Sequence, residues 1–358
     1  MEPKNNKPIT VLITCATGLG YPSYIKCLDK GIRKKARVIG TASVRDAVGF
    51  AFVDKGYCIS QPDDSVFIKD MLSVCLKEKV KVLIPTAPKE LMPIASNIDK
   101  FQKIGTSVLI SSVESLILSE DKNKFFNFCK KINIPTPNFF EVSNYKELKE
   151  AIIKLGYPEK RVCFKPAISS GSRGFRILAD QKNSLRDLLD GQSNNYINMN
   201  EVLAIFGKYK KFPELLAMEY LPGNEYSVDV LAENGKSVII VPRLRTKVVL
   251  GSSFGGVTVN QKEIIKYSKE IISRLHLNGI VGVQFKISEN KKPKVLEVNP
   301  RINGCMVLSA AAGANILEAA VTKELYGKFH APKIKWGTKL IRYYEEVYQD
   351  KNGKFFRF

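Results

Sequence analysis

The stretch 294–304, KVLEVNPRING, begins as an apolar strand and ends in polar side chains. Glu297, Asn299 and Arg301 stand at every second position, so on an extended chain they project from one face. Polar groups at the end of a buried strand need partners, because unpaired buried polar groups are costly. The stretch therefore predicts a binding site on this face; the alternative is that these side chains end in solvent.

A neighbouring segment supplies a further polar side chain. Gln284 lies on the apolar run VGVQFKIS (281–288), and the turn ENKK (289–292) should place that run beside the strand of Glu297. Magnesium prefers hard oxygen ligands such as carboxylates and amide carbonyls. Gln284, Glu297 and Asn299 are therefore the predicted metal ligands.

A lysine and a glycine-rich loop suggest phosphate binding. Lys165 ends the apolar strand CFKPA (163–167), and SSGSRG (169–174) follows it. Glycines let a backbone curl so that its N–H groups face phosphate oxygens. The predicted phosphate contacts are Lys165 and, in the loop, Ser170, Gly171, Ser172 and Gly174. The alternative is a hairpin loop beside an incidental lysine.

The start of a predicted helix adds weaker candidates. Lys122 and Lys124 follow Asp121 at the beginning of DKNKFFNFCKKINIP (121–135), an amphipathic segment. Either lysine can act as a second phosphate cation, although exposed helix lysines are common.

The segment MEYLPGNE (218–225) suits a nucleoside. A strand passes Glu219 and Leu221, bends at a Pro-Gly pair, and presents Glu225. Such a segment offers an apolar slot for a purine, and Glu225 can accept hydrogen bonds from ribose hydroxyls.

The strand within VPRLRTKVVLGSSFGG (241–256) carries alternating cations. Arg243, Arg245 and Lys247 share one predicted face and are expected to hold an anionic substrate. The alternative is a charged strand exposed to solvent.

Composition excludes several classes of protein. The 358 residues, 44% of them hydrophobic, can form two or three domains, and no apolar run is long enough for a membrane helix. Seven dispersed cysteines without a CxxC pair, and a start without signal-peptide order, predict reduced thiols in a cytoplasm. With two histidines, a zinc site is not expected. The net charge of +21 fits an acidic substrate or a lysine-rich surface, and no motif typical of nucleic-acid binding accompanies it.

Alternating strand and helix patterns organise the first 115 residues and favour an open parallel sheet. Strands are predicted at 9–15, 37–43, 81–86 and 106–111, with helices at 22–35 and 65–79 among them. The turn ATGLGYPSY (16–24) has a GxG but no third glycine, so it is interpreted as a tight turn rather than a dinucleotide site.

The remaining chain mixes helices with antiparallel strands. ENGK (233–236) is expected to be a hairpin turn, and residues 180–212 have no clear pattern. The predicted domains are 1–115, 116–190, 191–326 and 327–358, the last without an assigned role.

Five of these segments, in this order and spacing, resemble the ATP-grasp superfamily. They are DK at 121–122, FKPAISSGSRG at 164–174, MEYLPGNE at 218–225, Gln284, and LEVNPRINGCMVLSAAAGANI at 296–316. The Gln…Glu-x-Asn-Pro-Arg set is most similar to carbamoyl-phosphate synthase large chains. The resemblance covers nearly the whole chain, and its first third resembles the pre-ATP-grasp domain.

The resemblance implies a mixed α/β and α+β fold, in which a Rossmann-like domain precedes two lobes that hold ATP. It implies that a carboxylate attacks the γ-phosphate, and that an amine then displaces phosphate from the acylphosphate. By the resemblance, Lys122 and Lys165 grip phosphates, and Arg301 neutralises the transferring phosphoryl group. Glu219 and Leu221 then flank adenine, and Glu225 holds the ribose.

Two departures limit the identification within this family. A carboxylate is common where Gln284 stands, which leaves one or two metal ions open. The chain also holds one ATP-grasp unit without a glutaminase segment, so carbamoyl phosphate production is not the leading prediction. Arg301 and Lys165, with Arg243 and Arg245 on the acceptor side, are the predicted catalytic residues.

The predicted function is an ATP- and Mg²⁺-dependent (or Mn²⁺-dependent) carboxylate–amine ligase acting on a small anionic metabolite. Its rivals are an ATP-grasp ligase that modifies a protein residue, and a non-catalytic nucleotide- or nucleic-acid-binding protein. Nucleic-acid and membrane partners are not expected, and enzymes of this family are often dimers.

Overall fold

The computed structural model describes residues 9–28, 32, 36–168, 174–179, 195–249, 251–329 and 332–357. Its contacts divide the chain into two compact units. The first unit holds 1–117, 226–283 and 298–358, and the second holds 118–225 and 284–297. The division differs from the predicted domain limits, because the chain leaves and re-enters each unit.

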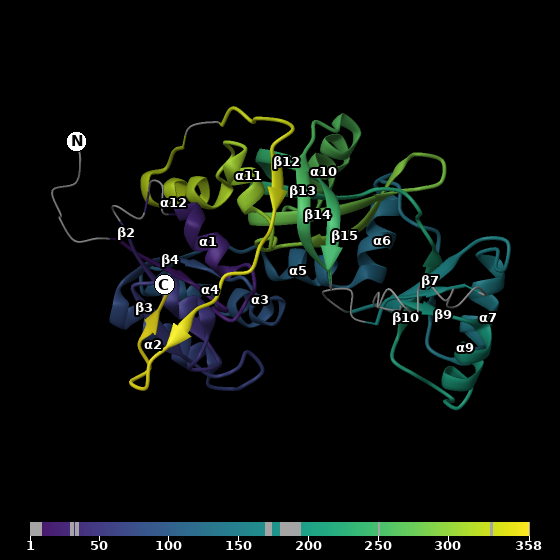
Figure 1. The fold of residues 1–358 in the computed structure, drawn as a ribbon, viewed down its shortest axis with the longest axis horizontal. Coiled ribbons are helices and arrows are strands. Elements are labelled where there is room, and N and C mark those ends of the chain that lie inside the picture. Colours follow the sequence, from purple (N-terminus) through teal and green to yellow (C-terminus); the bar gives the residue numbers. More distant parts are fainter. Residues whose placement is uncertain are drawn as a thin grey trace. The chain divides into compact units, whose positions relative to one another are not determined.

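A parallel sheet organises the N-terminal part of the first unit (Figure 1). Its order is β3-β2-β1-β4-β5, so the direction of winding reverses between β1 and β4. This sheet confirms the predicted open parallel arrangement. The strands are β1 (Ile9–Ile13), β2 (Ala36–Ala42), β3 (Lys55–Cys58), β4 (Val80–Ile84) and β5 (Ser107–Val108).

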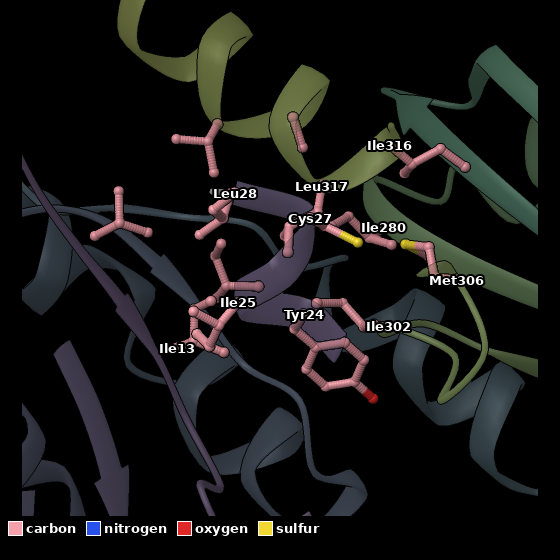
Figure 2. Close-up of a cluster of buried hydrophobic side chains, with 14 of the residues drawn as sticks. Ile13, Tyr24, Ile25, Cys27, Leu28, Ile280, Ile302, Met306, Ile316 and Leu317 are labelled. Carbon is pink, nitrogen blue, oxygen red and sulfur yellow. The ribbon is translucent and has the colours of Figure 1, made fainter. Parts of the chain in front are cut away.

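Both faces of this sheet are buried, because alternate residues of each strand enter different apolar clusters. Val11 and Ile13 pack into one cluster with α1 (Tyr21–Leu28), which Figure 2 shows. Leu12 packs into the other, with Met71 of α2 (Phe67–Glu78). This coverage is what near-continuous apolar strands require.

Shorter helices complete this part of the first unit. They are η2 (Val48–Phe52), α3 (Pro88–Ala95), α4 (Ile98–Lys103) and α5 (Val113–Glu120). The predicted helix at 22–35 is described only in part, since residues 29–31 and 33–35 lie outside the described chain.

A mostly antiparallel sheet forms the core of the second unit, in the order β6-β10-β7-β8-β9. Phe164 of its central strand packs with Leu148 and Ile152 of the neighbouring helix. The strands are β6 (Phe139–Val142), β7 (Val162–Pro166), β8 (Arg176–Leu178), β9 (Tyr196–Ile197) and β10 (Leu215–Glu219). The helices are α6 (Lys122–Lys131), α7 (Tyr145–Lys154) and α9 (Met199–Phe206).

A third sheet runs in the order β15-β14-β11-β12-β13-β16. Asn234 and Gly235 join β11 to β12 with φ angles of 45° and 81°, which confirms the predicted hairpin. The strands are β11 (Glu225–Glu233), β12 (Lys236–Val249), β13 (Ser252–Thr258), β14 (Gly279–Ile287), β15 (Pro293–Asn299) and β16 (Lys339–Ile341). The helices are α10 (Lys262–Arg274), α11 (Val307–Ala311) and α12 (Ile316–Tyr326).

The C-terminal segment has a structural role in the first unit. β16 pairs with β13, with Gly255 opposite Ile341, and so extends the third sheet. β17 (Tyr348–Gln349) and β18 (Phe355–Phe356) form a small hairpin, and the Arg357 guanidinium lies 4.7 Å from the centre of the Phe52 ring. In the described parts of the chain, no helix is both long and apolar enough to span a membrane.

Gly223 lies where the second unit has no room for a side chain. A Cβ there would stand 2.7 Å from Ile287 Cβ and 2.8 Å from the Ile287 carbonyl oxygen. Gly223→Ala is therefore expected to destabilise the protein by about 1–3 kcal/mol, measured by denaturant unfolding. Gly304→Ala is the control, because nothing lies within 4 Å of the added Cβ. Equal stability of the two variants would contradict this packing.

Candidate functional site

The predicted phosphate lysines are held close together in the second unit. Lys165 lies near the end of β7, and its ammonium lies 5.7 Å from the centre of the Phe126 ring of α6. Lys122 is the first residue of α6, and its backbone N–H donates to the carbonyl of Ala167, two residues beyond Lys165. The side chain of Asp121 caps this helix by accepting from Asn123 and Lys124 N–H groups.

The carboxylate of Glu297 acts on both lysines; Asp121 acts on Lys122 as well, and Glu225 on Lys165. Glu297 Oε2 lies 3.9 Å from Lys122 Nζ, and the Lys122 side chain is only 6% exposed. Burial lowers the pKa of Lys165 to about 8; the Glu297 charge opposes this shift and the Lys122 charge adds to it. Burial also lowers the pKa of Lys122. Two partly desolvated ammonium groups lie close enough to influence one another, and an anion such as a polyphosphate would stabilise their charged forms.

The end of the predicted phosphate loop requires glycine. Gly174 has a φ of +74°, and a Cβ there would lie 2.7 Å from Pro166 Cδ. The loop therefore returns directly against the strand that carries Lys165. Ser170, Gly171 and Ser172, the other predicted loop contacts, lie outside the described residues.

The predicted nucleoside segment follows β10. The carboxylate of Glu219 forms an ion pair with Lys294, and its backbone N–H donates to the Asn138 carbonyl at 3.0 Å. Leu221 is 4% exposed. The carboxylate and the backbone N–H of Glu219 therefore both have partners within the protein.

Glu225 is fixed by a turn that is tied to β14. The Gly223 N–H donates to the Ile287 carbonyl at 3.0 Å, and the Ile287 N–H donates to the Asn224 carbonyl at 2.9 Å. Glu225 begins β11 immediately after this turn and is half-buried. The turn explains how the Pro-Gly pair presents this carboxylate.

Sequence reasoning missed Tyr220, which lies between the candidate nucleoside residues. Lys286 Nζ lies 5.0 Å from the centre of its ring, and the Arg161 guanidinium lies 5.9 Å away. A lone tyrosine in a strand gives no signal of such contacts. The sequence feature that could have pointed to this contact is Lys286, which follows the predicted metal ligand Gln284 by two residues.

The predicted metal ligands fall on β14 and β15. Gln284 and Glu297, both half-buried, lie on these neighbouring strands of the second unit. Asn299, described with the first unit, ends β15, and its Oδ1 accepts from Arg301 Nη2 at 3.0 Å. Among the described residues, no three His, Cys, Asp or Glu side chains gather as a metal site.

The chemistry of the oxygen donors fits a hard cation. Gln284 and Glu297 provide amide and carboxylate oxygens, which suit Mg²⁺. One carboxylate supplies little negative charge for a site that binds a divalent cation without other anions. The set therefore fits a metal that arrives together with phosphate oxygens.

Arg243 corrects the prediction of a cationic strand face. Its Nε and Nη2 donate to both carboxylate oxygens of Asp229, at 2.6 and 2.8 Å, and Arg243 is 2% exposed. Asp229 also accepts from Asn303 and Ser309. Arg243 thus neutralises a buried carboxylate, and we assign it a structural role in place of substrate binding.

Arg245 and Lys247 also do not form the single cationic face that the sequence predicted. Arg245 Nε donates to Ser253 Oγ at 2.8 Å and Nη2 to the Gly251 carbonyl at 2.6 Å. The pairing register of β12 shifts between Arg245 and Lys247, so strict alternation fails there. Lys247 is exposed.

Arg301 differs from Arg243 in its partners. Besides Asn299 Oδ1, its guanidinium donates to the Ile302 carbonyl at 3.2 Å, and the residue is half-buried. Both acceptors are neutral. The guanidinium therefore keeps its charge uncompensated by these contacts.

Two protein families match parts of the chain. The family described as "ATP-grasp in the biosynthetic pathway with Ter operon" matches residues 211–344, and "PylC-like, N-terminal domain" matches residues 12–109. The first match covers the third sheet, and the second covers most of the parallel sheet.

Known proteins show the same likeness. The carbamoyl phosphate synthase large chain of Clostridium acetobutylicum is 27% identical over 270 residues, which are 72% of this chain and 23% of that protein. The chain thus spans about a quarter of the length of the curated relatives it matches.

Solved structures share the fold at low sequence identity. An ADP complex of N5-carboxyaminoimidazole ribonucleotide synthetase matches with a TM-score of 0.65 and 14% identity, over 95% of this chain and 82% of that one. The biotin carboxylase domain dimer of Hydrogenobacter thermophilus 2-oxoglutarate carboxylase, bound to MgADP, ADP and bicarbonate, matches with a TM-score of 0.64 and 16% identity, over 92% and 73%.

These findings confirm the resemblance and the fold class predicted from the motifs. Residues 211–344 thus resemble an ATP-grasp family and residues 12–109 a PylC-like N-terminal domain, and the fold is that of the solved structures described above.

The internal ion pair makes a strong stability prediction. Asp229→Asn leaves the Arg243 guanidinium buried without its counter-charge, and we expect about 3–5 kcal/mol of destabilisation in denaturant unfolding. Glu270→Gln, which breaks the exposed pair with Arg274, should cost less than about 1 kcal/mol. Similar losses in both variants would contradict the buried pair.

The pKa of Lys165 predicts how nucleotide binding depends on pH. Because the pKa lies near 8, Lys165 loses its charge between about pH 7 and 9, and a phosphate contact weakens with it. We expect the Kd of a non-hydrolysable ATP analogue to rise by roughly tenfold over this range, measured by calorimetry. Lys165→Gln should bind more weakly at pH 7 and lose most of the pH dependence. An unchanged dependence in the variant would remove Lys165 as its source.

Proposed function

We propose that the chain is an ATP- and Mg²⁺-dependent ligase, which joins a carboxylate of a small anionic metabolite to an amine. The observation that carries this proposal is the pair of buried ammonium groups, Lys122 and Lys165, next to Glu297. A nucleotide triphosphate supplies the matching negative charge. The likeness to ligases of the same fold supports the choice of reaction.

The reaction has two steps. A carboxylate oxygen of the acid attacks the γ-phosphorus, the bond to the β-phosphate oxygen breaks, and ADP leaves. The amine nitrogen then attacks the acyl carbon, the bond to the phosphate oxygen breaks, and the amine proton goes to solvent. The products are an amide, ADP and phosphate.

The protein contributes charge and position to these steps rather than a covalent nucleophile. Lys122 and Lys165 hold phosphate oxygens, whose charge they neutralise. Arg301 stabilises the charge on the transferring phosphoryl group. Fixed charges of this kind act where water is excluded and need no reorganisation during the reaction.

Gln284, Glu297 and Asn299 would hold Mg²⁺, and Mn²⁺ takes the same oxygen donors. When bound, the metal polarises phosphate oxygens and neutralises part of their charge.

The remaining predicted contacts bind the nucleotide. We place the adenine between Glu219 and Leu221, and assign the ribose hydroxyls to Glu225. Tyr220, between these residues, adds a ring that Lys286 already approaches. Ser170, Gly171 and Ser172 belong to this proposal as loop contacts to the phosphates.

Substrate size and assembly are part of the same proposal. The acid and the amine are small molecules, and a homodimer is proposed from the dimeric biotin carboxylase domain described above. Analytical ultracentrifugation tests the assembly.

The test is a screen of purified protein against pools of acids and amines, read as ADP and phosphate release and by mass spectrometry of the product. We expect release that requires one acid–amine pair and a divalent metal. Release that requires a protein acceptor would identify the protein-modifying rival. Absence of turnover, together with salt-sensitive retention of RNA or DNA, would identify the nucleic-acid-binding rival.

Glu297→Ala tests the metal assignment within the active pair. Its turnover should fall by about 100-fold or more, because a group that orients the metal and the phosphates is lost. Glu289→Ala is the matched control, since Glu289 is exposed on the turn between the same strands. Near-wild-type turnover of the Glu297 variant would contradict the assignment.

A further inference from the structure

A cavity lies at the edge of the parallel sheet in the first unit, beside β5, the last strand of that sheet. Its volume is about 400 Å³, which is in the range of small-molecule sites. Its walls come from α4, from residues in and around β5, from Asn278 just before β14, and from Glu324 of α12. None of these residues belongs to the candidate nucleotide or metal site, so the proposed ligase reaction gives this cavity no role.

Hydrogen bonds within the protein fix two of the walls. Thr106 Oγ1 donates to the Val80 carbonyl at 2.8 Å. The Asn278 side-chain amide donates to the Ile110 carbonyl at 3.2 Å, and its backbone N–H donates to Ser111 Oγ at 3.0 Å. Because these contacts do not involve a ligand, the cavity is preformed, which lowers the cost of ordering a bound molecule.

Two opposite charges lie beside neighbouring parts of the wall. The Glu324 carboxylate accepts a hydrogen bond from Ser107 Oγ, a neutral donor that leaves its charge in place. A Cβ added at Gly105 would lie 3.8 Å from Lys81 Nζ, so an ammonium group stands beside that glycine. Within the described ranges of the chain, neither Lys81 nor Glu324 forms an ion pair. Because Gly105 and Ser107 are two residues apart, the arrangement suits a ligand whose own two charges are close together.

The rest of the wall is apolar, apart from one amide. Ile98, Val108 and Ile110 contribute apolar side chains, and Val108 is only 8% exposed. Gln102 lies on α4, and its side-chain amide has no hydrogen-bond partner in the part of the chain that the structure describes. The wall therefore offers an aliphatic contact surface next to the two charges.

We propose that this cavity binds an aliphatic α-amino acid. The ligand ammonium group donates to Glu324, the ligand carboxylate accepts from Lys81 and from the Gln102 amide, and the side chain packs against Ile98 and Val108. A purely acidic or purely basic ligand would satisfy only one of the two protein charges. Glu324 and Lys81 are exposed, so each charge contact contributes modestly and severalfold effects are expected. The proposal is independent of the ligase function.

Binding of L-leucine to the full-length protein without nucleotide tests the ligand class. Two analogues are the controls: 3-methylbutylamine lacks the carboxylate of leucine, and 4-methylpentanoate lacks its ammonium group. We expect the Kd of leucine, measured by NMR titration of the ligand signals, to be at least about fivefold lower than that of either analogue. Equal or tighter binding of either analogue, or no binding of leucine at about 10 mM, would overturn the proposal.

Variants of the two charged residues test the orientation of the ligand. Glu324→Gln should raise the Kd of leucine by about fivefold and remove most of its advantage over 4-methylpentanoate. Lys81→Gln should instead remove most of the advantage over 3-methylbutylamine. Glu346→Gln and Lys269→Gln are the matched controls, because both side chains are exposed in the first unit and do not line the cavity. Unchanged leucine affinity in both Glu324→Gln and Lys81→Gln, with unchanged melting temperatures, would overturn the site.

Photolabelling shows where the amino acid binds. L-photo-leucine, which carries a diazirine in its aliphatic side chain, is irradiated with the protein, and labelled peptides are identified by mass spectrometry. We expect labels in peptides that contain Ile98, Val108 or Ile110, and loss of most of this labelling with excess leucine or in Glu324→Gln. Labels confined to other peptides would overturn the proposal, because leucine would then bind elsewhere, such as at a substrate site of the ligase. Labelling of the cavity wall in a protein without turnover of any acid–amine pair supports the cavity and removes only the ligase.

Discussion

Two ammonium groups held partly away from water are the constraint on which the second unit depends. Burial lowers the pKa of both Lys122 and Lys165; the Lys122 charge adds to the shift of Lys165, and the Glu297 charge opposes it. Such an arrangement is costly in an empty protein and becomes favourable when an anion binds. The capped helix, the end of β7 and the glycine turn at Gly174 all serve to hold these charges in place.

The first unit uses arginine in two different ways. Arg243 forms a buried ion pair with Asp229, and the Asp229 carboxylate also accepts hydrogen bonds from Asn303 and Ser309. Because Asn303 and Ser309 follow Arg301 in the chain, this network fixes the loop on which Arg301 lies. Arg301 donates to neutral acceptors instead, so these contacts leave its charge uncompensated. Burial and partners, rather than residue type, separate a structural arginine from a binding one.

The sequence predicts the apolar framework well, because buried strands and amphipathic helices have clear periodicity. β1, β4, α2, α6 and the β11–β12 hairpin all appear near their predicted positions. β3 was missed because its residues are mostly exposed and carry no apolar pattern. β10 pairs with β6 and β7, which precede the predicted limit at residue 190; the pairing depends on contacts distant in sequence, which a local pattern does not reveal.

Only part of the candidate site could be predicted from the sequence. Lys122, Lys165 and Glu297 were recognisable because each stands at the edge of an apolar segment, and the structure brings these three together. The internal role of Arg243 could not be predicted, because its partner lies on another strand and both side chains look exposed by pattern alone.

The most direct test of the central claim is calorimetric titration of a non-hydrolysable ATP analogue with Mg²⁺ into wild-type protein and the double variant Lys122→Gln/Lys165→Gln. We expect a Kd on the micromolar scale for the wild type, and loss of most of that affinity in a double variant that remains folded. Equal affinity in both proteins would contradict it, because the two ammonium groups would then have no part in holding the nucleotide.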